Sequence, residues 1–220
     1  MIIEDLIQGS PEWLMQRCGL CTASRVHDVV KRLQRASGAR QKGDYAQTHY
    51  DYLHELVIER LTGRAQDHGI GNLAAVEWGI ENEPLARAAY EMATDTECTP
   101  IGFAIHPKIE WFGASPDSLA GDDGLIEIKC LASHNHLDII MSGEIPDEHL
   151  PQMMAEMACA ERQWCDFISF DCRYPKHLQL FIKRLHRDDA LIQVMEAEVQ
   201  SFLAEVADAV ERLSKWKPSI

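Results

Sequence analysis

Two kinds of hydrophobic spacing alternate along the chain and divide it into helical and strand-rich parts. Apolar residues that recur every three or four positions predict amphipathic helices, and short runs rich in β-branched and aromatic residues predict strands. The segments that we interpret as helices are 11–17, 24–33, 45–61, 73–92, 134–141, 147–162 and 188–213. The segments that we interpret as strands are 98–106, 110–114, 125–130, 164–172 and 178–185.

Local signals define several boundaries of these segments. Ser10-Pro11 is a typical helix start, and Asn72 is the expected N-cap of the long helix 73–92. Pro84 lies inside that helix and predicts a kink or break just before it. The polar, basic and glycine-containing segment 34–44 predicts a mobile loop.

The order of these elements indicates an α/β fold. Four helical segments precede a mixed set of strands with intervening helices, and one helix closes the chain. We therefore predict a central mixed β-sheet flanked by helices. A length of 220 residues without internal repeats or a low-complexity linker predicts a single domain over residues 1–220.

The segment 111–130, WFGASPDSLAGDDGLIEIKC, has the pattern of a β-hairpin. We expect a first strand that ends near Pro116-Asp117, a turn at 121–124 and a second strand over 125–130. Alternation along the second strand puts Glu127 and Lys129 on one face. An acid and a lysine in an otherwise apolar strand are costly to bury without partners, and Asp117 is well placed to join them.

These acids suit divalent metal ions. Mg²⁺ prefers oxygen ligands and is commonly held by one or two carboxylates. On helix 73–92, the three-to-four-residue spacing allows Glu83 to face the hairpin. Glu83, Asp117 and Glu127 with the Ile128 carbonyl would suit two ions roughly 3.5–4 Å apart, the arrangement of metal-dependent phosphodiester cleavage. The alternatives are a partly exposed strand with a Glu–Lys pair and an ordinary solvated helix acid at position 83.

Composition and charge leave the class of substrate open. The seven cysteines, an odd number, and the absence of a signal-peptide pattern or long apolar run predict free thiols in a reducing cytoplasm and no membrane association. A net charge of −14 argues against a nucleic-acid partner. A basic tract over 25–42 and an acidic segment over 188–208 nevertheless predict a polarised molecule with a basic channel. An acidic enzyme that never meets DNA remains the alternative.

Several motifs together resemble one known family, that of phage lambda exonuclease and the YqaJ-like viral recombinases in the PD-(D/E)xK nuclease superfamily. The matching residues, in the family's order, are Trp13, Arg17-x-Gly19, Thr22-Ala23-Ser24, Trp78-Gly79, Glu83, Ser115-Pro116-Asp117, Glu127-x-Lys129-Cys130 and Gln152. The resemblance implies a restriction-endonuclease-like core. It also implies a Mg²⁺-dependent exonuclease, with Mn²⁺ as a substitute, that processively degrades the 5′-ended strand of linear duplex DNA and leaves a 3′ overhang for recombination.

The resemblance also implies a role for each matching residue. Metal ligands would be Asp117, Glu127 and the Ile128 carbonyl, with Glu83 at a second ion and Lys129 as the residue that activates water. A pocket for the 5′-terminal phosphate would consist of Arg17, Ser24, Ser115 and Gln152. The chemistry agrees, because a helix N-terminus at Ser24 favours an anion and arginine is a forked phosphate donor. A helix cap, a surface arginine and a polar turn residue are the alternative interpretations of Ser24, Arg17 and Gln152.

Strand separation and partners are implied by the same resemblance. An apolar side chain before the Trp-Gly pair, here Val76, would act as a wedge together with Arg32 or Arg35. A homotrimeric ring and a single-strand annealing protein are the expected partners. Two other hypotheses remain at this point: a restriction-like endonuclease on the same fold, and a DNA-end-binding module without catalysis.

Overall fold

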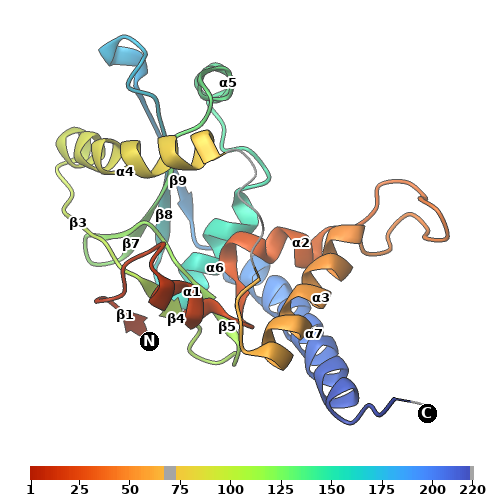
Figure 1. The fold of residues 1–220 in the computed structure, drawn as a ribbon. Helices are drawn as coiled ribbons and strands as arrows, with labels where there is room; N and C mark the ends of the chain where they lie inside the picture. The colour runs from red at the N-terminus through yellow and green to blue at the C-terminus, as the bar shows by residue number, and fades with distance from the viewer. Residues whose placement is uncertain (67–72, 219–220) are drawn as a thin grey trace.

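Two β-sheets form the centre of the computed structural model, which describes residues 1–66 and 73–218 (Figure 1). The smaller sheet has the strand order β1 (Ile2–Ile3), β4 (Phe103–Ile105), β5 (Phe112–Ala114) and β2 (Cys21–Thr22). The larger sheet has the order β3 (Cys98–Thr99), β6 (Ser118–Ala120), β7 (Gly124–Lys129), β8 (Trp164–Phe170) and β9 (Leu180–His186). Strands β7 and β8 are parallel and their other neighbours antiparallel, which confirms the mixed sheet predicted from the sequence.

Helices cover both faces of the larger sheet (Figure 1). The described helices are α1 (Pro11–Arg17), α2 (Val26–Val30), α3 (Gln47–Thr62), α4 (Leu73–Thr94), α5 (Ser133–Ser142), α6 (Leu150–Ala160) and α7 (Asp189–Ser214). Helix α4 packs on β7, β8 and β9, whereas α6 contacts strands of both sheets as well as α2 and α7. Helix α6 is therefore the element that joins the two halves of the fold.

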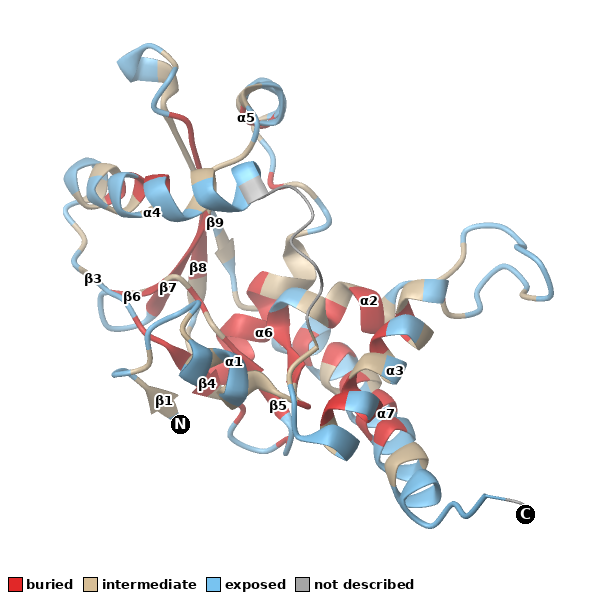
Figure 2. Cartoon of the chain, viewed as in Figure 1, coloured by how far each residue is buried: buried red, intermediate tan, exposed pale blue. Residues whose placement is uncertain are grey.

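The alternation predicted for β7 is confirmed by its packing. Leu125 belongs to the core cluster that also contains α6, whereas Ile126 and Ile128 belong to a second cluster with Ala86 of α4. Every residue of α6 from 153 to 160 is buried, and the helix lies in the red interior of Figure 2. A polar side chain on either element is thus held by dense packing, which fixes its direction.

The predicted hairpin is wrong in its first strand. Strand β5 ends at Ala114 in the smaller sheet, the chain crosses to the larger sheet, and β6 begins at Ser118, after Asp117. At the crossing, the Asp117 carboxylate accepts the backbone N–H of Ile128 at 2.5 Å, in place of a strand-to-strand bond. The strand predicted over 98–106 divides in the same way, into β3 of the larger sheet and β4 of the smaller one. Between them, Gly102 lies so close to Leu6 that a Cβ would stand 2.1 Å from the Leu6 carbonyl oxygen.

Two helix predictions also need correction. The segment 24–33 forms a 3₁₀ turn (Ala23–Arg25) followed by α2, which ends at Val30. Helix α4 is continuous through Pro84, so of the predicted kink or break the break does not occur. Ala86 and Tyr90, both fully buried, pack its second half on the sheet, and the Asn82 side chain donates to the Trp78 carbonyl. The predicted cap Asn72 lies outside the described residues.

Candidate active site

Three of the predicted catalytic residues meet where the two sheets adjoin. Strand β7 directs Glu127 and Lys129 to the same face, and Lys129 Nζ lies 2.6 Å from Glu127 Oε1. Asp117 joins them through its bond to the Ile128 N–H. The Glu127 side chain is almost completely buried, with 2% of the residue exposed. The crossing between sheets therefore brings an acid from one connection against an acid and a lysine from a central strand.

Helix α6 contributes two further residues, of which sequence reasoning found only Gln152. Gln152 Nε2 donates to Glu127 Oε1 at 2.6 Å and to Glu156 Oε1 at 2.8 Å. Glu156 is 1% exposed and was absent from the predicted site. A signal existed, because an acid in the apolar sequence LPQMMAEMACA, one helical turn after Gln152, is rarely buried without a partner.

The electrostatics of this cluster show a deficit of positive charge. Burial raises the pKa of Asp117, and the charges of Glu127 and Glu83 raise it further. Burial and the Glu127 charge likewise raise the pKa of Glu156. Burial disfavours the charged form of Lys129, but Glu127 and Asp117 outweigh it, so that the pKa of this amine is raised. Within the cluster one lysine thus faces several carboxylates.

The donor set fits a hard divalent cation. Among the described residues, the buried oxygens without a hydrogen-bond partner include Glu127 Oε2 and Glu156 Oε2. Carboxylate oxygens in excess of cations are the ligands that Mg²⁺ takes. In this conformation Lys129 and Gln152 occupy Glu127 Oε1, and no three acidic, histidine or cysteine side chains over 1–66 and 73–218 converge as a ready metal cage.

Glu83 approaches the cluster from α4. Burial raises its pKa, the nearby Arg87 lowers it, and the charge of Glu127 adds to the upward shift. Its carboxylate is paired with Arg87 at 2.5 Å, one helical turn further along. Glu83 is therefore close enough for the charge of Glu127 to shift its pKa, but Arg87 of the same helix holds its carboxylate.

All four residues predicted for the phosphate pocket line one cavity with the acidic cluster. The cavity has a volume of about 170 Å³. Its walls include the four predicted residues, Arg17, Ser24, Ser115 and Gln152, together with Asp117, Glu127, Lys129 and Glu156. One small ligand could therefore contact residues of five segments. These are α1, the turn before α2, the sheet crossing, β7 and α6.

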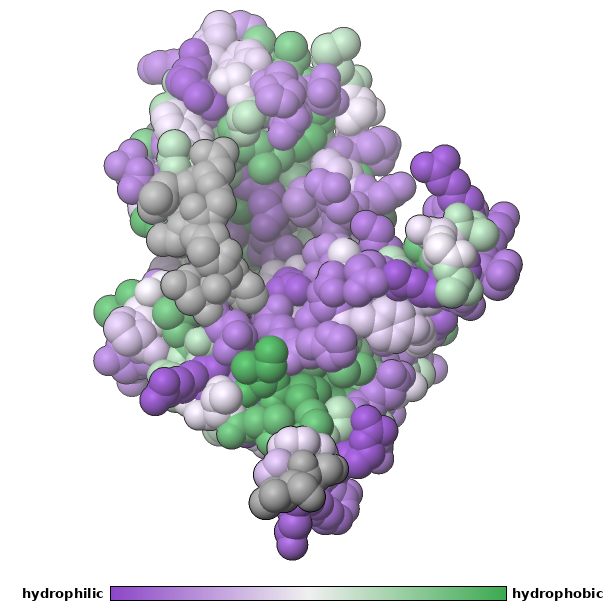
Figure 3. Space-filling model, turned by 45° about the vertical axis from the view of Figure 1, so that its right-hand side comes forward, coloured by the Kyte–Doolittle hydropathy of each residue, from purple (hydrophilic) through white to green (hydrophobic). Residues whose placement is uncertain are grey.

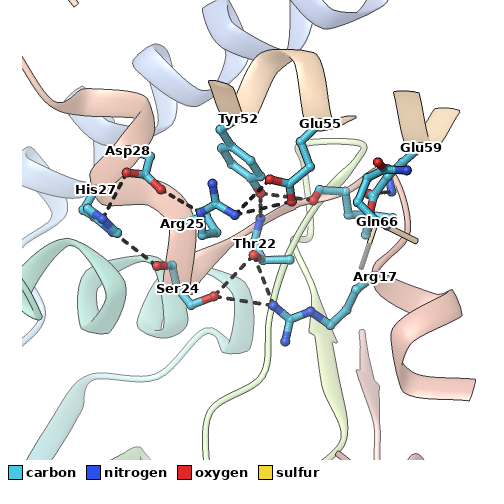
Figure 4. A network of polar contacts seen from close by, with 12 residues as sticks. Arg17, Thr22, Ser24, Arg25, His27, Asp28, Tyr52, Glu55, Glu59 and Gln66 are labelled. Carbon is cyan, nitrogen blue, oxygen red and sulfur yellow. Dashed lines mark hydrogen bonds and ion pairs between the residues drawn. The ribbon is translucent and has the colours of Figure 1, made fainter. Parts of the chain in front are cut away.

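Arg17 is a cation without a strong partner in this pocket. Its guanidinium lies over the Trp13 ring at 3.9 Å and reaches the hydroxyls of Thr22 and Ser24 only at 3.4 and 3.5 Å (Figure 4). Burial lowers its pKa. The ion pairs found among the described residues do not include Arg17. A desolvated guanidinium with weak neutral partners is suited to an anion.

A polar network fixes the wall that carries Arg17 and Ser24 (Figure 4). Arg25 pairs with Asp28 at 2.6 Å and with Glu55 of α3 at 3.1 Å. The Thr22 backbone N–H donates to the Tyr52 hydroxyl at 3.0 Å. Ser24 lies within the 3₁₀ turn before α2, so the predicted helix N-terminus at this residue is wrong. Its hydroxyl nevertheless lies 3.5 Å from the Arg17 guanidinium.

The residues predicted as a wedge lie apart from one another. Val76 is half exposed on α4. Arg32 donates to both oxygens of Glu198 on α7 at 2.9 Å and stacks on Tyr45, so its guanidinium is already paired within the chain. Arg35 is exposed in the loop after α2. Of the two arginines, Arg35 is the one left available for a strand-separating role.

One face of the molecule carries a polar hollow. Figure 3 shows this side of the molecule hollowed between the part with α4 and α5 and the part with α2 and α3, with hydrophilic surface in the hollow.

All seven cysteines are free, as predicted, and burial raises the pKa of Cys21 to about 12. Within the described ranges, no helix combines the length and apolar character needed to cross a bilayer.

The chain has a PD-(D/E)xK nuclease fold. Helices flank its mixed sheets, and two acids and a lysine meet on β7 and at the adjoining crossing. The sequence model of one protein family, described as the YqaJ-like viral recombinase domain, matches residues 12–163. The chain therefore belongs to the YqaJ-like viral recombinase family and is a nuclease of the lambda exonuclease type. Nucleases of this type generally use divalent metals.

Solved structures agree with this assignment. The chain is 44% identical to LHK-Exo in complex with dAMP, with a TM-score of 0.84 over 94% of this chain and 97% of that one. It is 42% identical to the alkaline exonuclease LHK-Exo from Laribacter hongkongensis, with a TM-score of 0.82 over the same shares. A phage-related exonuclease from Haemophilus somnus 129PT has the same fold at 13% identity, with a TM-score of 0.62 over 88% and 96% of the two chains. No curated protein matches.

Proposed function

We propose that the protein is a Mg²⁺-dependent 5′→3′ exonuclease that degrades the 5′-ended strand of linear duplex DNA and leaves a 3′ overhang for recombination by annealing. The supporting observation is that two groups of residues line one cavity. One is the wall that carries Arg17 and Ser24, and the other is the acidic cluster, which consists of Asp117, Glu127, Lys129 and Glu156. A nuclease that must start from a terminus needs an anchor for that terminus beside the cleaved bond. A restriction-like endonuclease has no use for such an anchor.

In this proposal the acidic cluster binds the metal, and Lys129 orients the attacking water. Asp117, Glu127 and the Ile128 carbonyl would hold Mg²⁺, and Glu83, which is paired with Arg87 in this structure, would assist at a second ion. Such ions would make water more acidic and would stabilise the leaving oxygen. Lys129, held 2.6 Å from Glu127, orients the attacking water and neutralises a phosphate oxygen.

The opposite wall binds the end of the DNA. Arg17 supplies a forked cationic donor, Ser24 and Ser115 supply hydroxyls, and Gln152 supplies an amide. Trp13 keeps two of these groups in place, because its ring lies under Arg17 and its Nε1 donates to Ser115 at 3.0 Å. Anchoring the terminal phosphate sets which phosphodiester bond reaches Asp117 and Lys129.

Assembly and partners are further parts of the proposal. A ring-shaped homotrimer would retain the duplex and make cleavage processive, and a single-strand annealing protein would take up the 3′ strand. Val76 and Arg35 would separate the strands ahead of the pocket. The hydrophilic hollow in Figure 3 offers a polar surface to the incoming duplex.

The deciding experiment compares 5′-phosphorylated linear duplex with closed circular duplex, each with Mg²⁺ or with EDTA, and resolves the products by strand. We expect nucleotides from the 5′-ended strand of the linear duplex in Mg²⁺ alone. Cleavage of closed circles would favour the endonuclease. End binding without nucleotide release in Mg²⁺ would favour the inactive module.

A further inference from the structure

The side-chain amide of Gln152 has no hydrogen to spare for a phosphate in this structure. Its Nε2 donates to Glu127 at 2.6 Å and to Glu156 at 2.8 Å. A primary amide has two N–H groups, so both are in use. The nitrogen must face the two acceptors, and only the amide oxygen remains for a ligand. An oxygen accepts hydrogen bonds and cannot donate one to a phosphate.

The two glutamates that hold Gln152 differ in how easily they can release it. Glu127 Oε1 is shared with Lys129 Nζ at 2.6 Å, and a cation at Glu127 would compete for the same lone pairs. Glu156 lies one helical turn after Gln152 on a fully packed helix. Burial does not distinguish the two, because both are almost completely buried and each has one oxygen without a hydrogen-bond partner. The difference is that Lys129 shares Glu127 Oε1, whereas Glu156 is held beside Gln152 by the helix that carries both. Glu127 is therefore the exchangeable acceptor and Glu156 the fixed one.

We propose that Glu156 is a positioning residue that keeps one N–H of Gln152 in place, so that the other N–H passes from Glu127 to the 5′-terminal phosphate when a divalent cation binds Glu127. The inference rests on the proposed function of the pocket. Cation and phosphate then favour each other's binding, because the cation frees the donor that the phosphate needs. Glu156 thereby links metal binding to recognition of a phosphorylated end.

Fluorescence anisotropy of blunt duplexes with a 5′-phosphate or a 5′-hydroxyl tests this coupling. Phosphorothioate linkages at the 5′ end block cleavage, and binding is compared in EDTA and in Ca²⁺, which takes similar oxygen ligands. In the unaltered protein, Ca²⁺ should increase the preference for the 5′-phosphate. Glu156→Leu, which keeps the volume and removes the acceptor, should lower that gain by about tenfold. Glu156→Gln keeps an acceptor oxygen and should retain most of it.

Two comparisons keep the test independent of folding. Met153→Leu, a buried change on the same helix, is the matched control and should leave the preference unchanged. Gln152→Leu should abolish the Ca²⁺-dependent gain, and the double variant Gln152→Leu/Glu156→Leu should lose no more than Gln152→Leu does. A gain that persists in Gln152→Leu, or in a folded Glu156→Leu, overturns the inference. Equal binding of both ends by the unaltered protein in Ca²⁺ would instead reject the phosphate pocket itself.

Discussion

The two walls of the pocket carry opposite charges that are not balanced within each wall. On the wall made by β7 and α6, carboxylates outnumber cations, and burial raises the pKa of Asp117 and of Glu156. On the wall made by α1 and the turn before α2, burial lowers the pKa of Arg17, which has only weak hydroxyl partners. Neither wall neutralises the other. This contrast supports our proposal that one wall binds a cation and the other an anion.

The largest effect should come from removing the amine on the acidic wall. Lys129→Ala should lower exonuclease activity by about 10³-fold or more, because positioned groups in phosphoryl chemistry contribute at this scale. Release of nucleotides from 5′-phosphorylated linear duplex in Mg²⁺ measures it. Lys183→Ala, which removes a surface lysine paired with Glu144, is the matched control and should retain activity. Activity retained by both variants would reject the site.

The next effect should come from the opposite wall. Arg17→Ala should reduce the preference for a 5′-phosphate over a 5′-hydroxyl by about 10- to 100-fold, the size expected when a charge-assisted hydrogen bond is lost. Arg17→Lys should recover only part of it, because an ammonium lacks the forked geometry. Competition between the two duplexes gives the ratio directly. An unchanged ratio in Arg17→Ala would show that this wall does not bind the terminus.

A third effect concerns stability. An acid whose pKa is raised in the folded state binds more protons there than when unfolded, so its contribution to the free energy of unfolding falls as pH rises above the ordinary carboxyl value. Asp117 and Glu156 should therefore destabilise the metal-free protein more at pH 8 than at pH 6. Mg²⁺ at a concentration a hundred times its Kd at pH 6 should add about 2.7 kcal/mol to the free energy of unfolding at that pH. The same concentration should add more at pH 8, where the ionised acids bind the cation more tightly.

Thermal unfolding at pH 6 and pH 8, in EDTA and in Mg²⁺, measures this effect. Glu156→Gln should shrink the pH dependence in EDTA because it removes one of the two titrating groups. A Mg²⁺-induced rise in Tm that is the same at both pH values would contradict the link between the buried acids and the cation.

The smallest effect should come from the proposed wedge. Val76→Ala should shorten the tract degraded per binding event by about two- to threefold, because half of its side chain is already exposed and little packing is lost. Leu85→Ala, an exposed apolar change further along α4, is the control. Single-turnover degradation with a DNA trap measures the tract length, and equal tracts in both variants would argue against a wedge at position 76.

The acid–lysine pair was predictable because its signal is local. Strand alternation alone put Glu127 and Lys129 on one face. The packing confirms it, because Leu125 lies in one core cluster and Ile126 and Ile128 lie in the other. The capping residue Ser10 was predictable for the same reason, since its side chain accepts the Trp13 N–H. The family resemblance placed the α/β fold correctly.

Other features depend on contacts between distant segments and could not be predicted. The crossing at Asp117 needs two sheets to adjoin, and a hairpin pattern carries no information about a second sheet. The continuity of α4 through Pro84 depends on packing that overrides the local preference for a break. Glu156 bonds Gln152 of its own helix, but it is buried beside Glu127 only when α6 packs on β7. Its sequence position alone therefore predicted no role for it.

The most direct test of the account is a crystal structure with a 5′-phosphorylated duplex and Mn²⁺. We predict cation density between Asp117, Glu127 and the Ile128 carbonyl, and the terminal phosphate against Arg17 and Ser24 in the same pocket. Absence of the cation from those oxygens, or a terminal phosphate bound elsewhere on the molecule, would contradict the claim that the two walls serve one reaction.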